Sequence, residues 1–180
     1  MELANAENGW INTIDSKKPE IIEKARQIIK NTVYCTVATC SKDGFPWASP
    51  LLFVYDELWN IYWSSAITAR HSQNIDRDRG RVAIALFNTS KEVGVVQGLF
   101  FEGTASEADP KQVESLIEMV FRRTGKQVNR TARDYLDDSP RRFYQFQPKE
   151  VWITGDRVPI GNQLVDTKIK LRLADLIEKQ

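Results

Sequence analysis

The sequence has few of the residues on which metal centres, disulfide frameworks and catalytic triads depend. Its 180 residues include two cysteines, Cys35 and Cys40, and one histidine, His71. Two cysteines cannot build the disulfide framework of a small secreted protein, and a metal site would need other soft ligands nearby. The two cysteines have opposite parity on one predicted strand, so they should point to opposite faces. We therefore expect neither a disulfide nor a metal centre.

Excess charge and long apolar runs are also missing. Lysine and arginine (25 residues) balance aspartate and glutamate (24 residues), which leaves a formal net charge of +1. No global field therefore draws the chain to nucleic acid or to an anionic membrane. No apolar stretch approaches the roughly 18 residues of a membrane-spanning helix, and the N-terminus lacks the basic and apolar regions of a signal peptide. We expect a cytoplasmic protein without nucleic-acid or membrane partners.

What the sequence does contain is a series of strand patterns with helices between them. The length fits one domain over residues 1–180, with a polar N-terminal extension at 1–18 and a C-terminal extension at 156–180. Runs of β-branched and aromatic residues predict strands at 32–39, 45–55, 58–64, 81–88, 95–105 and 142–154, the last one bent at Pro148. The strand at 81–88 is almost wholly apolar, which predicts burial of both its faces.

Helical patterns separate these strands. A 3.6-residue apolar period predicts a first helix from about Pro19, and a short polar helix within 66–81 has Thr68 as a candidate N-cap. Asp109 and Gly125 bound a third helix. The last stretch fits both a strand and a helix, and we favour the helix. Neighbouring strands joined by short turns predict an antiparallel meander that closes as a small barrel, in a mainly β (α+β) fold.

The segment IYWSSAITARHSQNI holds the first candidate site. Ser64 and Ser65 end a strand, and Thr68, Arg70 and His71 open the next helix. Hydroxyl donors, a cation and the free amides of a helix N-terminus together suit a phosphate. The alternative interpretation is a solvated helix start in which Thr68 caps and Arg70 faces water.

Two further strand segments hold candidate ligand contacts. The prolines of Pro46-Trp47-Ala48-Ser49-Pro50 leave neighbouring backbone groups free to meet a flat ring, although they equally fit a protected edge strand. The Gln97 amide could both donate to and accept from a flavin-like ring edge, and the alternative is a satisfied core glutamine beside Gly98. The charged run from Arg122 to Arg142 is interpreted as a solvated surface.

In their order and spacing, these segments resemble the FMN-binding split-barrel superfamily, the pyridoxamine 5′-phosphate oxidase-like proteins. The resemblance covers roughly residues 20–155 and rests on TVYCTVATCSKDGFPWASPLLFVYDE, LWNIYWSSAITARHSQNI, RVAIALFN and VVQGLFFEGTASEAD. It implies an antiparallel six-stranded split β-barrel with flanking helices. It also implies an FMN cofactor and a homodimer whose cofactor site lies at the interface, completed by Trp152 or the C-terminal segment of the partner.

The resemblance also implies roles for individual residues. Ser64, Ser65 and Thr68 would lie at the phosphate or ribityl chain, with Arg70 and His71 at the pair that grips the phosphate. The isoalloxazine would meet Gln97 and the strand residues Trp47, Ala48, Ser49 and Pro50. The C-terminus lacks the Arg-x-His segment of the true oxidases, so oxidation of pyridoxamine phosphate is not expected.

The resulting hypothesis is an FMN-dependent oxidoreductase whose substrate and catalytic residues the sequence does not identify. The alternative is a non-enzymatic split-barrel module for binding or dimerisation, with haem or another ligand in its grooves.

Overall fold

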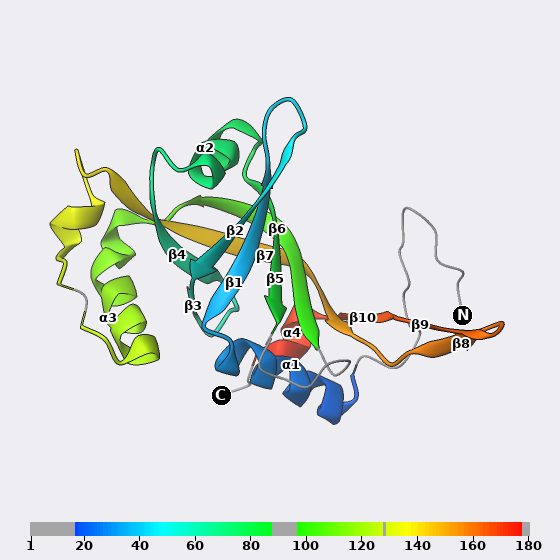
Figure 1. The fold of residues 1–180 in the computed structure, drawn as a ribbon. Coiled ribbons are helices and arrows are strands. Elements are labelled where there is room, and N and C mark those ends of the chain that lie inside the picture. The colour runs from blue at the N-terminus through cyan, green and yellow to red at the C-terminus, as the bar shows by residue number, and fades with distance from the viewer. Residues whose placement is uncertain (1–16, 88–96, 128, 178–180) are drawn as a thin grey trace.

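A computed structural model describes residues 17–87, 97–127 and 129–177 (Figure 1). Its helices are α1 (Pro19–Asn31), α2 (Arg70–Arg77), α3 (Val113–Thr124) and α4 (Leu173–Leu176). Its strands are β1 (Tyr34–Cys40), β2 (Pro46–Leu52), β3 (Val54–Tyr55), β4 (Ile61–Ala66), β5 (Arg81–Phe87), β6 (Gly98–Glu107), β7 (Arg141–Thr154), β8 (Val158–Ile160), β9 (Gln163–Val165) and β10 (Lys168–Leu171).

One curled antiparallel sheet forms the body of the protein. Its hydrogen-bonded order is β2-β1-β5-β6-β7-β4-β3, and β10 pairs with β7. Helix α2 covers one end of the curled sheet, whereas α1 and α4 lie at the other end (Figure 1). The predicted antiparallel split barrel is confirmed. The strand count is higher than six because β3 separates from β2 at Phe53 and because β10 and the β8–β9 ribbon add short strands.

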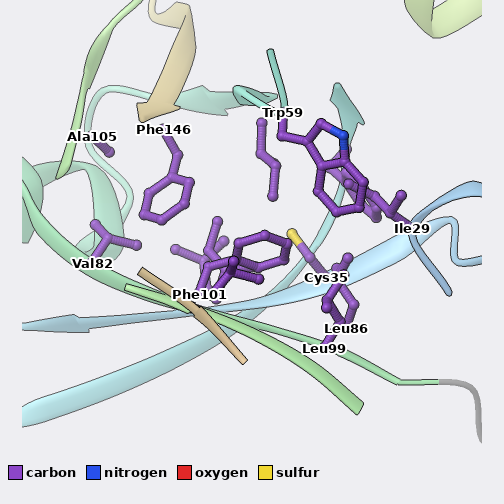
Figure 2. Packing of buried hydrophobic residues seen from close by; sticks show 14 of the residues in the cluster. Ile29, Cys35, Trp59, Val82, Leu86, Leu99, Phe101, Ala105 and Phe146 are labelled. Atoms are coloured by element: carbon purple, nitrogen blue, oxygen red, sulfur yellow. The ribbon is translucent and has the colours of Figure 1, made fainter. Parts of the chain in front are cut away.

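The barrel interior is filled by side chains from the inward positions of the strands. Figure 2 shows Trp59, Phe101 and Phe146 packed with aliphatic residues of β5 and β6. Gly103 lies where β6 and β7 change register, opposite Pro148, so the predicted bend at this proline is confirmed. A Cβ on Gly103 would lie 2.1 Å from the Gln147 carbonyl oxygen, and the two strands can approach this closely because the side chain is absent.

Strand β5 differs from its prediction. Val82, Ile84 and Leu86 are buried, but Ala83 is exposed and Phe87 is 43% exposed, so burial of both faces is wrong. An apolar run does not distinguish a doubly buried strand from an alternating one whose outward residues are also apolar. The same outward face continues across β1 and β2, because Ala38 pairs with both Ala48 and Ala83. We call this surface the outer sheet face; its exposed residues include Tyr34, Ala38, Ala48, Pro50, Ala83 and Phe87.

Arg123 joins α3 to the end of α1. Its guanidinium lies 4.5 Å from the centre of the Phe53 ring and donates to the carbonyl oxygens of Ile29 and Thr32, where α1 leaves carbonyls unpaired. Burial lowers its pKa from the ordinary arginine value. The prediction of a solvated arginine run is therefore wrong at Arg123, although it holds at Arg122, which pairs with Glu118 on an exposed helix face.

The remaining predictions concern the helix ends, the C-terminus and the cysteines. Gly125 ends α3 with a left-handed φ of +64°, as predicted, whereas Asp109 caps a short 3-10 turn ahead of α3. The C-terminal segment contains both β10 and α4. Both cysteines are free, and burial raises the pKa of the Cys35 thiol to about 12. Across the described residues, no helix is long and apolar enough to cross a membrane.

Candidate functional site

Helix α2 begins at Arg70, after the turn that leaves β4. Its N-cap residue is Ala69, whose side chain caps no amide, so Thr68 is not the cap that the sequence predicts. Thr68 lies within the turn, which is closed by the Ala69 amide donating to the Ala66 carbonyl oxygen at 3.0 Å. The first amides of α2 therefore have no side-chain acceptor, a condition that favours an anion at this helix end.

The only histidine bridges two strands that are not neighbours in the sheet. His71 Nδ1 lies 3.1 Å from Ser49 Oγ on β2, and Nε2 lies 2.6 Å from Ser65 Oγ on β4. Strand β2 begins the hydrogen-bonded order and β4 is the sixth strand along it. The ring therefore spans the open side of the curled sheet. We call these three side chains the Ser49–His71–Ser65 bridge.

The bridge is nearly enclosed. Ser49 and His71 are 8% exposed and Ser65 is 5% exposed. Burial lowers the pKa of His71, which favours the neutral ring. Both ring nitrogens already contact serine hydroxyls, so the ring has no further nitrogen to offer a ligand in this arrangement. Any ligand in this position would meet the hydroxyls first.

An aromatic and cationic layer lies beside the bridge. Trp47 Nε1 donates to Ser49 Oγ at 3.1 Å. The Arg70 guanidinium carbon lies 4.7 Å from the centre of the Trp47 ring and 5.5 Å from that of Phe45. Since Arg70 is exposed, its N–H groups can still reach an anion while its guanidinium lies over the indole.

A second set of contacts holds α2 against the hairpin of β1 and β2. Asn74 Nδ2 donates to Thr39 Oγ1 at 3.0 Å, and that hydroxyl lies 3.4 Å from the Trp47 carbonyl oxygen. Sequence reasoning did not single out Asn74 or Thr39. The sequence pattern that could have identified Asn74 is the spacing of His71, Asn74 and Ile75, which places these residues on one face of a short helix.

Strand β2 lies at one edge of the sheet, and its backbone is free on the outer side. Backbone hydrogen bonds join the two residue pairs that flank the β1–β2 ladder, Ser41 with Phe45 and Val33 with Phe53. Bonded pairs alternate in an antiparallel ladder, so the even-numbered residues of β2 direct their backbone groups away from β1. Ala48 therefore presents its N–H and C=O at the free edge, between two prolines that have no N–H.

The structure gathers part of the predicted site. Trp47, Ser49, Ser65, Arg70 and His71 form one cluster around the start of α2. By strand alternation, Ala48 and Pro50 point to the opposite face of β2 from Ser49, and Ser64 points away from Ser65.

Gln97 is not part of this cluster within one chain. It precedes Gly98, the first residue of β6, whose amide donates to Thr154 Oγ1 at 2.8 Å. The other end of β6, where Glu107 pairs with Tyr144, lies on the α2 side of the sheet. Gln97 is therefore about the full length of β6 away from His71.

Three buried polar atoms on β4, α2 and β7 form no hydrogen bond with another described residue: Trp63 Nε1, Ser72 Oγ and Tyr144 OH. The Trp63 and Tyr144 rings stack at a centroid distance of 6.0 Å. Burial raises the pKa of Tyr144 from its ordinary value.

Other parts of the described chain hold no stronger candidate. A wide hollow of about 1260 Å³ lies between α1, α3 and Trp59, and none of the predicted site residues lines it. No group of three or more His, Cys, Asp and Glu side chains in the described ranges could hold a metal ion.

Comparisons with known proteins identify a family and a shared fold. The family model described as pyridoxamine 5′-phosphate oxidase matches residues 21–155. The UPF0306 protein PM1958 of Pasteurella multocida is 32% identical over 83 residues, which are 45% of this chain and 54% of that protein. This chain therefore spans only about half the length of that relative.

Solved structures share the fold at low sequence identity. A haem-binding protein from Mycobacterium smegmatis is 20% identical with a TM-score of 0.64, over 89% of this chain and 61% of that one. A structure described as an F420 reductase is 15% identical with a TM-score of 0.54, over 70% of this chain and 94% of the other. At these identities the likeness concerns the fold alone.

Proposed function

Because this chain belongs to the pyridoxamine 5′-phosphate oxidase family, we propose that it is an FMN-binding flavoprotein that acts as an oxidoreductase on a small-molecule substrate. The observation that carries the proposal is the Ser49–His71–Ser65 bridge, placed at the uncapped start of α2 beside Arg70. Hydroxyls, free amides and a guanidinium are the donors that recognise a phosphate dianion.

The residues around the bridge fit the phosphate end of FMN. Ser49 and Ser65 would donate from hydroxyls held in place by the His71 ring. Thr68, on the turn beside them, would face the phosphate or the ribityl chain, whereas Ser64 points to the other face of β4. Arg70 would contribute a charge-assisted contact from the rim, with its plane supported by Trp47.

The edge of β2 fits a flat heteroaromatic ring. Ala48 offers one donor and one acceptor there, and Pro46 and Pro50 keep a further strand from pairing at this edge. Bound there, the flavin would supply hydride transfer at its N5 atom. The protein would bind the phosphate, orient the ring and leave one ring face open to a substrate.

We further propose that the protein works as a homodimer formed through the outer sheet face. Tyr34 is 63% exposed and Phe87 is 43% exposed, and alanines and a proline fill much of the surface between them. A sheet face of this kind favours contact with an identical face about a two-fold axis. A second copy would bring its own Gln97, Trp152 or C-terminal segment towards the edge of β2, which would explain why Gln97 lies far from His71 in one chain.

The main alternative is a non-enzymatic module that binds haem, which is what the Mycobacterium smegmatis neighbour binds according to its description. Haem iron in proteins takes an axial ligand, most often histidine. Here the one histidine directs both ring nitrogens at serine hydroxyls, so it would have to leave the bridge. The geometry therefore favours a phosphate-bearing ligand over haem.

The visible spectrum and the bound ligand of the purified protein distinguish FMN from haem. We expect the visible absorbance of a bound flavin, and release of FMN on denaturation, identified by mass spectrometry. Release of haem would support the alternative. A colourless protein that takes up neither added FMN nor haem would remove both.

A further inference from the structure

The His71 ring, which the proposed function uses only to hold two hydroxyls, also controls how many protons those hydroxyls can offer. Ser49 Oγ already accepts a hydrogen bond from Trp47 Nε1. Its own proton is therefore free only when His71 Nδ1 donates to it, and otherwise it donates that proton to Nδ1. The Ser65 hydroxyl lies 2.6 Å from Nε2, so it likewise either accepts a hydrogen bond from the ring or donates its proton to it.

In the neutral ring, only one nitrogen carries a proton. In either tautomer, one serine accepts a hydrogen bond from the ring N–H and can donate its own hydroxyl proton to a ligand. The other serine donates its hydroxyl proton to the unprotonated ring nitrogen and has none left for a ligand. In the protonated ring, both nitrogens donate. Both hydroxyl protons then become available, and a positive charge lies directly behind them.

We propose that the Ser49–His71–Ser65 bridge couples anion binding to proton uptake: the ring is neutral in the free protein and takes one proton from solvent when a phosphate dianion binds at the start of α2. The inference rests on the proposed function for the identity of the site, and it adds how that site is regulated. Protonation provides a second hydroxyl donor and a counter-charge in the same step.

The surroundings of the ring favour this two-state behaviour. Burial disfavours the charged ring in the free protein. No carboxylate forms an ion pair with the ring, so an incoming dianion would be its first close counter-ion among the described residues.

Several ionisable side chains lie on the elements that pack around the ring. They include Arg70, Asp76 and Arg77 of α2, Cys40 of β1, Asp43 of the β1–β2 turn, Tyr62 of β4, Glu107 of β6, and Arg141, Arg142 and Tyr144 of β7. Glu107 and Arg142 pair with each other at 3.5 Å, and the Tyr62 hydroxyl donates to Asp56. Strand β2 has no ionisable side chain. None of these groups forms a hydrogen bond with the imidazole, so the anion itself would set its charge.

The coupling has a defined sign. Because the bound state holds one proton more than the free state, affinity for a dianion rises as pH falls, by at most about tenfold per unit. This pH dependence of the affinity is measured above pH 7, because a phosphate monoester itself gains a proton and loses its dianionic form near its second pKa of about 6. Above the pKa of the ring in the complex, the extra affinity is lost.

The single histidine makes a direct measurement possible. Long-range ¹H–¹⁵N spectra of the whole chain contain one imidazole pair, so they report the tautomer and charge of His71 without assignment. We expect a neutral ring in the free protein at pH 7.5. Saturation with inorganic phosphate, and separately with FMN, should convert it to imidazolium.

The matched binding experiment uses His71→Gln, whose amide can still donate to Ser65 but does not titrate. Calorimetric titration with FMN in two buffers of different ionisation enthalpy should show net proton uptake in the wild type and none in the variant. The wild-type affinity should fall as pH rises from 7 to 8.5, whereas the affinity of the variant should stay level.

The outcomes separate the two proposals. If phosphate protonates the ring but FMN does not bind, the coupling stands and the proposed cofactor is wrong. If FMN binds while the ring stays neutral, or if His71→Gln keeps the wild-type pH slope, the coupling is wrong and the cofactor stands. If neither anion binds, both proposals are wrong.

Discussion

The guanidinium carbon of Arg70 lies over the indole of Trp47, 4.7 Å from the ring centre, and this contact joins the first residue of α2 to the edge strand β2. Trp47 also donates to Ser49, one of the two hydroxyls held by His71. The stack and the bridge are therefore parts of one assembly. Arg70 is placed by this contact at the rim of the site.

The first prediction concerns Arg70 as an anion ligand. Arg70→Ala should weaken FMN binding by about 1.5–3 kcal/mol, the range of a hydrogen bond to a charged group, which is roughly a 10- to 150-fold loss in affinity. Fluorescence titration of FMN measures it. Arg77→Ala, at the exposed far end of the same helix, is the control and should bind as the wild type does. Equal losses of FMN affinity in the two variants would show that the positive charge of α2 matters and would contradict a direct contact between Arg70 and the phosphate.

The second prediction concerns the junction of α1 and α3. Arg123→Ala removes a cation stacked on Phe53 and leaves the Ile29 carbonyl without its donor. We expect the free energy of unfolding in urea to fall by about 2–3 kcal/mol. Arg122→Ala, the neighbouring exposed residue, should change it by less than about 0.5 kcal/mol. A similar small change at both positions would contradict a supporting role for Arg123.

The third prediction concerns the crossing of β6 and β7. Gly103→Ala would bring a Cβ to 2.1 Å from the Gln147 carbonyl oxygen and 2.9 Å from the Phe146 ring, so the strands must separate. Urea denaturation should show a loss of about 3 kcal/mol or more. At Gly125, where φ is +64° but no atom lies within 4 Å of a new Cβ, the same change should cost only about 1 kcal/mol. A Gly103→Ala protein as stable as the Gly125→Ala protein would show that β6 and β7 are not this close.

The fourth prediction concerns the outer sheet face. Ala83→Arg places a bulky charge in the middle of the proposed dimer contact and should convert the dimer to monomer at micromolar concentration. Light scattering after gel filtration measures the mass. Ser115→Arg, on the exposed side of α3, adds the same group elsewhere and should leave the dimer intact. A wild-type chain that is monomeric, or an Ala83→Arg variant that stays dimeric, would exclude this face as the interface.

Local signals in the sequence were enough for most of the fold. The apolar period of α1, the bend at Pro148 and the left-handed Gly125 each depend on a few neighbouring residues, and each is found where it was predicted. The exposure of β5 was not predictable, because Ala83 and Phe87 are apolar whether or not a partner covers them. The burial of Arg123 depends on Phe53 and on the end of α1, which are distant in the sequence.

The site was predictable as a set of residue types but not as an arrangement. The sequence Ser-Ser-Ala-Ile-Thr-Ala-Arg-His places hydroxyls and cations near a helix start, and the structure gathers Ser65, Arg70 and His71 there. The contact between His71 and Ser49 joins residues 22 positions apart across the open side of the sheet. Such a contact follows from how the sheet curls, and no local pattern encodes it.

A parallel titration of the wild-type protein with FMN and with riboflavin tests the phosphate site at the start of α2 most directly, because the two flavins share the ring and differ in the phosphate. We expect saturable binding of one FMN per chain and binding of riboflavin at least about 30-fold weaker, since the phosphate contacts supply roughly 2 kcal/mol or more. Equal affinity for the two flavins, or no saturable binding of either, would contradict a phosphate site at the start of α2.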